Sequence, residues 1–294
     1  MSNNKNLQYE KQLISFIDIL GFKEIVKNSE NDPQLLKNIC ETIRFLKKWE
    51  KPTSWNLETI EIEEDAQLRG LDSFNITDKS YCTCFSDSII VSVKIATGDI
   101  NALFSTLVAN LALMGANLAE QGIFIRGAIT IGNLIHENDI IIGQGLIDAY
   151  NTETKLANFP RIVISEKLLK ELIYPLETKS NRYPYHLYLT RDKDGCVGFH
   201  QLKYFEVIQA SPKNNILKAS LDKIRKEIIK ALDSSFESPS IYQKYQWLKD
   251  QYNNNLFVLS EDTKLKIMEL NEGIAGNNIH YSYTDDFYYK NKLP

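Results

Sequence analysis

Cysteine is scarce in this chain, with four among 294 residues. Only Cys82 and Cys84 lie close together, and that spacing fits neither a zinc knuckle nor a disulfide framework. We therefore expect reduced, mostly buried thiols. The four histidines show no metal-ligand spacing either, and we expect them at surface or hairpin positions.

Net positive charge and long apolar runs are also lacking. The formal net charge is −4, so no global positive field attracts nucleic acid, and an anionic substrate has to be met by local donors or a metal ion. No stretch reaches the roughly 18 to 20 consecutive apolar residues that span a bilayer, and the polar residues 1–12 lack the apolar centre of a signal peptide. We expect a cytoplasmic protein with a small-molecule site and without nucleic-acid or membrane partners.

Apolar residues nevertheless make up 43% of the chain, enough for one large domain or a core with an appended domain. Short β-rich runs alternate with segments of helical spacing, which predicts a mixed α/β fold with helices on one face of a sheet. The expected order is strand, two helices, two strands, helix, two strands and helix, at residues 12–19, 23–50, 79–96, 99–122, 123–145 and 145–160. The acidic, turn-rich residues 51–78 indicate an exposed excursion.

The last 130 or so residues differ in character. Residues 160–175 predict one more strand and helix, residues 183–208 a hairpin that turns at 193–195, and the rest is helical with abundant Tyr, Asn and Lys. We expect a catalytic domain over 1–165 and a mixed, mainly helical extension over 166–294.

Two aspartates stand at the ends of apolar β runs. Asp18 interrupts the stretch QLISFIDILGFKEIV, and Asp87 lies at the tip of an expected hairpin. If the sheet brings both carboxylates together, their repulsion calls for divalent cations, and such hard oxygen ligands select Mg²⁺ or Mn²⁺. Alternatively, Asp18 caps the helix that begins near Lys23, and Asp87 only forms a β-turn.

Arg126 is the single cation in the apolar strand IRGAITIGNLI. Its guanidinium can bind two phosphate oxygens at once. It can equally form a structural ion pair.

Two motifs resemble those of the class III nucleotidyl cyclases. FIDILGF at 16–22 is similar to their first metal motif, and FSDSIIVSV at 85–93 is similar to their second, with Ser86 where the usual residue is Gly. Residues 126–165 more closely resemble the pyrimidine cyclases of the bacterial Pycsar anti-phage systems. The resemblance covers about residues 12–170, and it implies a ferredoxin-like core with a mostly antiparallel sheet.

The resemblance implies that Asp18, the carbonyl of Ile19 and Asp87 hold two Mg²⁺ or Mn²⁺ ions. The ribose 3′-oxygen would then attack the α-phosphorus, and pyrophosphate would leave. Backbone N–H groups of the turn Leu20-Gly21-Phe22-Lys23, at a helix amino terminus, suit the β- and γ-phosphates. Phe16 shares the face of Asp18 by strand alternation and can line the ribose or base pocket.

Base choice in these cyclases is tied to the position four residues before the second aspartate. Thr83 occupies it here, beside Tyr81, and matches neither the Lys of adenylyl cyclases nor the Glu of guanylyl cyclases. The family's catalytic arginine is replaced by Asn151. Arg126 is the candidate substitute, with Asn151 or Lys155 as helpers.

The resemblance therefore implies a uridylate cyclase that makes cyclic UMP from UTP for anti-phage signalling through a separate effector protein. A cytidylate cyclase acting on CTP is the near alternative, and a catalytically silent nucleotide-binding regulator is the alternative from another class. We also expect a homodimer with its sites at the subunit interface.

Overall fold

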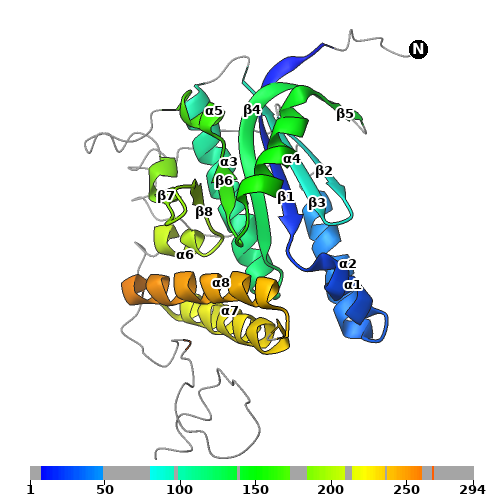
Figure 1. Cartoon of the computed structure of the whole chain (residues 1–294), viewed down its shortest axis with the longest axis vertical. Coiled ribbons are helices and arrows are strands. Elements are labelled where there is room, and N and C mark those ends of the chain that lie inside the picture. The colour runs from blue at the N-terminus through cyan, green and yellow to red at the C-terminus, as the bar shows by residue number, and fades with distance from the viewer. Residues whose placement is uncertain are drawn as a thin grey trace, which may run out of the picture.

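A computed structural model describes residues 8–48, 80–95, 99–137, 140–172, 184–208, 214–235, 237–259 and 267. The excursion expected at 51–78 lies outside these residues. The described strands form an eight-stranded sheet in the order β2-β3-β1-β4-β6-β8-β7, with β5 paired to β4 beside this path (Figure 1). Their bounds are Glu10–Ile19 (β1), Ser80–Phe85 (β2), Ser88–Lys94 (β3), Ile125–Glu137 (β4), Ile140–Ile142 (β5), Ile162–Ile164 (β6), Thr190–Arg191 (β7) and Val197–Phe199 (β8).

The helices follow the order expected from the sequence. They are Phe22–Ser29 (α1), Pro33–Lys48 (α2), Ile100–Ala119 (α3), Gln144–Leu156 (α4), Glu166–Leu169 (α5), Lys203–Ile208 (α6), Asn214–Ser235 (α7) and Pro239–Leu259 (α8), with a 3₁₀ turn at Pro184–Leu187. Every described strand pair is antiparallel except β4 with β6. The mixed α/β fold with a mostly antiparallel sheet is confirmed.

Strand β1 lies in the middle of the sheet, and its two faces pack in two different hydrophobic cores. Leu13, Ile17 and Ile19 belong to the main core, together with the side chains of α3. Helix α3 is long and apolar enough to cross a membrane by length and composition, but 67% of its most apolar window is buried inside the protein. This is the all-round apolar core helix that the sequence predicts. The other face of β1 carries Ile14 in a second small core, and by alternation Asp18 as well.

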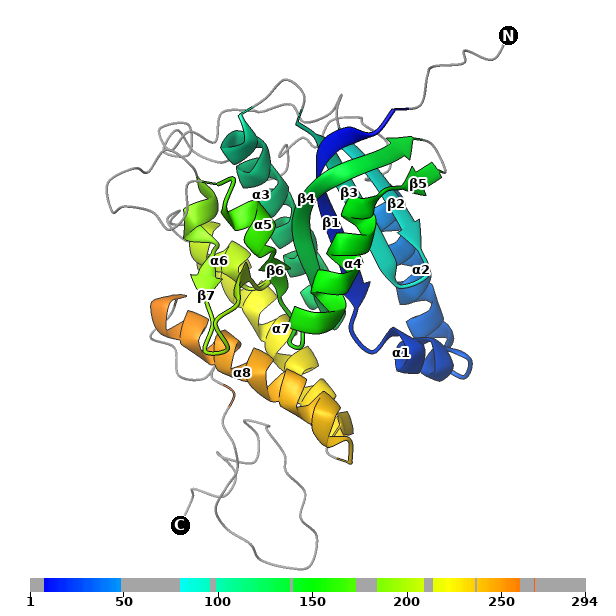
Figure 2. The same ribbon diagram turned by 45° about the horizontal axis from the view of Figure 1, so that its top comes forward.

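Helix α4 covers that other face, so the expectation of helices on one face only was wrong. Ala149 of α4 packs with Ile14 and Leu134 in the second core, and α4 lies across β4 and β1 in Figure 2. The approach is close because glycines face each other: a Cβ on Gly132 of β4 would lie 2.7 Å from the Cα of Gly145. Sequence periodicity indicated that α4 was a helix but not which face of the sheet it covers.

The chain beyond residue 165 continues the same sheet and then adds two long helices. Strands β7 and β8 form the expected hairpin, whose turn is closed by a 2.9 Å bond from Gly195 N–H to the Asp192 carbonyl. Helices α7 and α8 run side by side at one end of the sheet (Figures 1 and 2), joined by a bond from Tyr252 Oη to the Leu221 carbonyl. The boundary at residue 165 stays a prediction.

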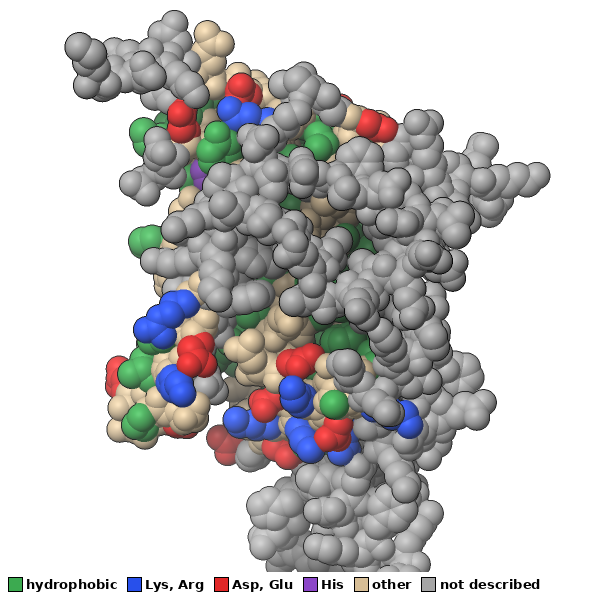
Figure 3. Space-filling model, turned by 180° about the vertical axis from the view of Figure 1, so that it is seen from behind, with side chains coloured by type: hydrophobic (Ala, Val, Ile, Leu, Met, Phe, Trp, Pro, Cys, Tyr) green, Lys and Arg blue, Asp and Glu red, His purple; other side chains and the backbone are tan. Residues whose placement is uncertain are grey.

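Charged side chains of both signs are interspersed on the back of the molecule, along the lower part of its described surface (Figure 3). Helix α7 contributes ion pairs such as Lys226 with Asp222, at 2.6 Å. The described residues on this side therefore form no extended patch of one sign.

Replacing Gly132 with Ala should destabilise the fold by about 1–3 kcal/mol, because the added methyl group meets the backbone of α4 rather than a side chain that can move. Chemical denaturation measures the free energy of unfolding. The control is Asn133→Ala, since Asn133 is the exposed neighbour on the same strand. Equal stability of the two variants would contradict the close packing of α4 on β4.

Candidate functional site

The structure places Asp18, on β1, beside Asp87, in the turn that leads into the neighbouring strand β3, at one end of the sheet. Asp18 is paired in register with Ser88 of β3, and the N–H of Ile19 donates to the carbonyl of Asp87 at 3.1 Å. Asp87 lies in the two-residue turn between β2 and β3, as the hairpin prediction requires. Ser86, the other turn residue, has φ of 54°, a left-handed conformation that favours glycine. The residue that departs from the resembled motif thus sits where glycine fits best.

Arg126 lies beside Asp18 on the other neighbouring strand, β4, and joins it to a second carboxylate. Its Nε donates to Asp18 Oδ2 at 2.9 Å and lies 3.0 Å from Glu153 Oε1 of α4. Because Nε carries one hydrogen, which points to Asp18, Glu153 Oε1 has no hydrogen-bond partner. The Nη1 of Arg126 donates to the Ala157 carbonyl at 3.4 Å. The structural ion pair considered from the sequence is what the structure contains.

Glu153 was missed by the sequence analysis, although a signal exists. Gly145, Ala149, Glu153 and Ala157 follow one another at intervals of four, which puts them on one helix face. Three of them are small, as expected of a helix that lies close to a sheet, and Glu153 is 2% exposed. A carboxylate on a small-residue face is a candidate for a buried ion pair.

Burial dominates the electrostatics of both carboxylates. It raises the pKa of Asp18 above its ordinary value, against the opposing effect of Arg126 and with a further increase from the negative charge of Asp87. Burial likewise raises the pKa of Glu153, again opposed by Arg126. Lys244, on α8, also interacts electrostatically with Asp18 and Glu153, and no sequence motif pointed to it.

The turn after β1 begins helix α1 without a side-chain cap. Gly21 is the N-cap residue, with φ of 72° and no side-chain hydrogen bond to the helix, so the capping alternative for Asp18 is wrong. The N–H of Leu20 donates to the Phe124 carbonyl at 2.8 Å, so it is engaged and does not face a phosphate as expected. Phe22 and Lys23 occupy the first turn, where N–H groups have no partner within the helix.

The residues expected to read the base lie on the same sheet face but are held by a histidine. Thr83 Oγ1 is 3.0 Å from His136 Nε2, and Ser92 Oγ is 2.9 Å from His136 Nδ1. The Tyr81 ring lies 5.5 Å from the His136 ring. His136 is buried, which lowers its pKa to about 4, so its neutral ring accepts from one hydroxyl and donates to the other. His200 is also buried, so the expected surface placement was wrong for these two histidines, although His136 lies in the antiparallel pair β4–β5 and His200 directly follows β8 of the β7–β8 hairpin.

The remaining predicted residues lie on or beside α4. Phe16 makes an edge-to-face contact with Tyr150, with ring centroids 5.5 Å apart. Asn151 and Lys155 are exposed on the side of α4 that faces away from Glu153. The structure therefore does not bring either of them to Asp18 within one chain.

Within the described ranges, no group of three or more His, Cys, Asp and Glu side chains is arranged to hold a metal ion. Asp18 and Asp87 provide two carboxylates, and the carbonyl of Ile19 follows directly on β1. A divalent cation at this place needs further oxygen ligands from a bound molecule.

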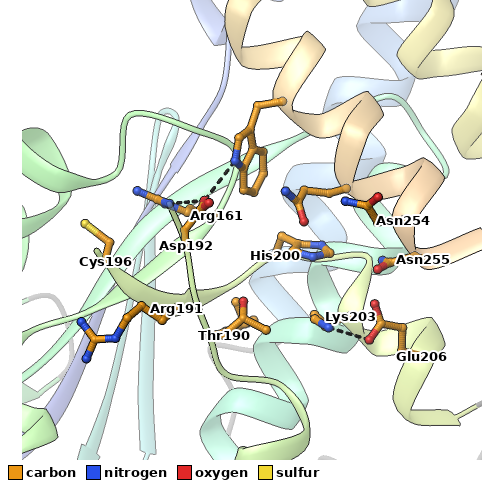
Figure 4. Close-up of a pocket in the computed structure, with 14 residues that line it drawn as sticks. Arg161, Thr190, Arg191, Asp192, Cys196, His200, Lys203, Glu206, Asn254 and Asn255 are labelled. Carbon is orange, nitrogen blue, oxygen red and sulfur yellow. Dashed lines mark hydrogen bonds and ion pairs between the residues drawn. The ribbon is translucent and has the colours of Figure 1, made fainter. Parts of the chain in front are cut away.

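A second, polar pocket of about 310 Å³ lies between the β7–β8 hairpin and α8. Most of its charged groups already have partners: Arg161 pairs with Asp192, which also accepts from the Trp247 indole, and Lys203 pairs with Glu206 (Figure 4). The Asp18 site has a buried carboxylate oxygen without a hydrogen bond, Glu153 Oε1, and it is the stronger candidate for catalysis.

No protein-family model matches this sequence, and no curated protein is significantly similar to it. Among solved structures, the chain is similar to the adenylyl cyclase CyaB from P. aeruginosa, at 18% identity and a TM-score of 0.35 over 56% of this chain and 81% of that one. It is also similar to the catalytic core of a rhodopsin-guanylyl cyclase with converted specificity, solved with ATPalphaS, at 17% identity and a TM-score of 0.34 over 65% and 93%. A third similar structure is a class III adenylyl cyclase-like ATP-binding protein from Pseudomonas aeruginosa. Its sequence identity is 10% and its TM-score 0.37, over 68% of this chain and 40% of that one. At these TM-scores, function has to be argued from the side chains of the site.

Replacing Glu153 with Gln should change the pH dependence of stability. Since the folded-state pKa of Glu153 is above its ordinary 4.5, the folded chain holds this proton more tightly than the unfolded chain. The stabilisation from this tighter proton binding is complete below pH 4.5 and is lost as the pH rises through the folded-state pKa of Glu153.

The measurement is the free energy of unfolding of the wild type and of Glu153→Gln, at pH values from 4 to 7 and with a metal chelator present. The wild type should lose stability relative to Glu153→Gln as the pH rises. Exposed Glu166 is the control, because Lys170 lowers its pKa. The wild type should therefore gain stability relative to Glu166→Gln as the pH rises, opposite to the change expected for Glu153→Gln. A difference between wild type and Glu153→Gln that does not vary with pH would contradict the burial of an ionisable Glu153.

Proposed function

We propose that the Asp18 site binds a nucleoside triphosphate with divalent metal ions and converts it to a 3′,5′-cyclic nucleotide and pyrophosphate. The observation that carries this proposal is the position of Asp18 near the end of β1 beside Asp87 in the β2–β3 turn, with the Ile19 N–H bonded to the Asp87 carbonyl. The order and separation of their motifs resemble those of class III nucleotidyl cyclases. The mostly antiparallel sheet agrees with that resemblance.

The two carboxylates fit a divalent cation. The charge of Asp87 raises the pKa of Asp18, a repulsion that a shared cation would remove. Carboxylate and carbonyl oxygens suit Mg²⁺ or Mn²⁺, and phosphate oxygens would complete the coordination. When bound, two such ions would activate the ribose 3′-hydroxyl and stabilise the negative charge on the phosphates.

The chain's own groups bind and orient the nucleotide. The first turn of α1, at Phe22 and Lys23, directs backbone N–H groups and the positive end of the helix dipole toward the phosphates. Gly21 supplies the left-handed conformation that starts this helix beside Asp18. Phe16, held by its contact with Tyr150, presents an aromatic surface to the ribose or base.

For the base, we propose a pyrimidine, with UTP first and CTP second. Support comes from Thr83, whose hydroxyl is fixed by neutral His136, so the position carries no charge of the kind found in purine cyclases. On the same resemblance, the product acts through a separate effector in anti-phage defence, and the enzyme works in the cytoplasm.

A homodimer is proposed because an apolar face lies open beside the site. We name as the apolar face the exposed side chains of Phe85, Ile147 and Tyr150, the first of which is 77% exposed. They come from the end of β2 and from α4. A second copy on this face would also bring the exposed Asn151 toward a site.

A silent nucleotide-binding regulator is the second candidate. Arg126 already contacts Asp18 and Glu153, and Asn151 replaces the arginine of the resembled motif. Binding without turnover would result if no other cation reaches the transferring phosphate.

The first test incubates the chain with each of the four ribonucleoside triphosphates and Mn²⁺ and identifies products by mass spectrometry. We expect cyclic UMP or cyclic CMP, and a loss of about a hundredfold or more in Asp18→Asn and Asp87→Asn, because several kcal/mol of stabilisation depends on the metal ligands. Asp250→Asn, an exposed carboxylate on α8, is the control. Nucleotide binding without any product would favour the silent regulator, and a purine product would refute the choice of base.

A second test concerns the dimer. Ile147→Asp should convert a dimer into a monomer in light scattering, because a charge would be buried in the apolar contact. Leu187→Asp is the control, since Leu187 is also 52% exposed but lies on the 3₁₀ turn. Equal masses for the two variants would rule out assembly through the apolar face.

A further inference from the structure

Helix α8 lies against the turn that follows Asp18. The hydroxyl of Tyr245 is 3.7 Å from the place where a Cβ on Gly21 would stand, and the Tyr245 ring packs on Phe124 with centroids 5.9 Å apart. Phe124 in turn accepts the N–H of Leu20 and leads into β4, two residues before Arg126. The C-terminal helical pair therefore forms one wall beside the site.

Lys244 precedes Tyr245 on this helix and is half-buried. It interacts electrostatically with Asp18, Glu153 and Arg126, and burial together with the charge of Arg126 lowers its pKa. No described carboxylate lies within ion-pair distance of its ammonium group. Lys244 is thus a cation held close to the site without a direct partner.

The other cation of the site is already committed. The Nε of Arg126 contacts both Asp18 and Glu153, and Nη1 reaches the Ala157 carbonyl. The position of the resembled catalytic arginine is occupied by Asn151, which is exposed on α4. Within one chain, Lys244 therefore adds a described cation that is available for an anion, besides the exposed Lys23 in the first turn of α1.

We propose that Lys244 binds the phosphate groups of a nucleotide held at Asp18, so that the C-terminal extension supplies a substrate-binding cation to the catalytic domain of the same chain. This inference rests on the proposed function of the site. A flexible ammonium donates three hydrogen bonds without the fixed geometry of a guanidinium, which suits it to a phosphate chain. Binding would also relieve its unfavourable proximity to Arg126.

The test measures binding rather than turnover, by calorimetry on the full chain with Mn²⁺. The probes are UTP, CTP, UMP, CMP and inorganic tripolyphosphate, which has neither base nor sugar. Lys244→Met removes the charge and keeps much of the side-chain volume, Lys244→Arg keeps the charge, and Lys230→Met is the control, since Lys230 is an exposed lysine on α7. Thermal unfolding of each variant detects a purely structural effect.

Lys244→Met should weaken the binding of tripolyphosphate and of the preferred triphosphate by roughly ten- to a hundredfold, the size of a charge-assisted contact. Its effect on the monophosphates should be smaller, Lys244→Arg should restore most of the affinity, and Lys230→Met should bind as the wild type does. Equal triphosphate affinity in wild type and Lys244→Met would overturn the role of Lys244 and leave the proposed function standing. A wild type that binds no triphosphate would overturn the proposed function itself, and so would remove the basis for this inference. Equal weakening for all probes, with a lower melting temperature, would assign Lys244 a structural role and overturn the proposal.

Discussion

The contact of Arg126 with a buried carboxylate, Glu153, and a partly buried one, Asp18, is the interaction on which the rest of the site depends. Asp18 and Glu153 come from β1 and α4, and Arg126 comes from β4 between them. A carboxylate with 2% exposure, such as Glu153, is stable as an anion only beside a cation. The three elements are therefore fixed to one another by charge as well as by packing, and Asp18 is held in place while one of its oxygens stays free of Arg126.

Close packing makes this arrangement possible. Gly132 and Gly145 let α4 approach β4 to within backbone contact, which brings Glu153 within reach of Arg126. On the opposite face, α3 and the apolar residues of β1 form the main core. A sheet supported on both faces keeps its strand ends in register, and the bond from the Ile19 N–H to the Asp87 carbonyl keeps Asp87 beside Asp18.

The sequence was informative where the determinants are local. Alternation along β1, the short turn at Ser86 and Asp87 and the apolar character of α3 each lie within about twenty residues, and the predicted strand and helix order followed from them. Glu153, His136 and Lys244 depend on contacts between segments far apart in the chain, for instance 53 residues between Thr83 and His136. Periodicity gives the face on which such a side chain lies but not the segment that covers it. For this reason the partners of Arg126 and the position of α8 could not be predicted.

The central claim is that Asp18 and Asp87 hold divalent metal ions together with a nucleotide. The most direct measurement counts bound Mn²⁺ by electron paramagnetic resonance in the presence of 3′-deoxy-UTP or 3′-deoxy-CTP, which lack the attacking hydroxyl. We expect nucleotide-dependent binding of two ions per site, lost in Asp18→Asn. Nucleotide-dependent Mn²⁺ binding that is undiminished in Asp18→Asn, or absent from the wild type, would contradict this account.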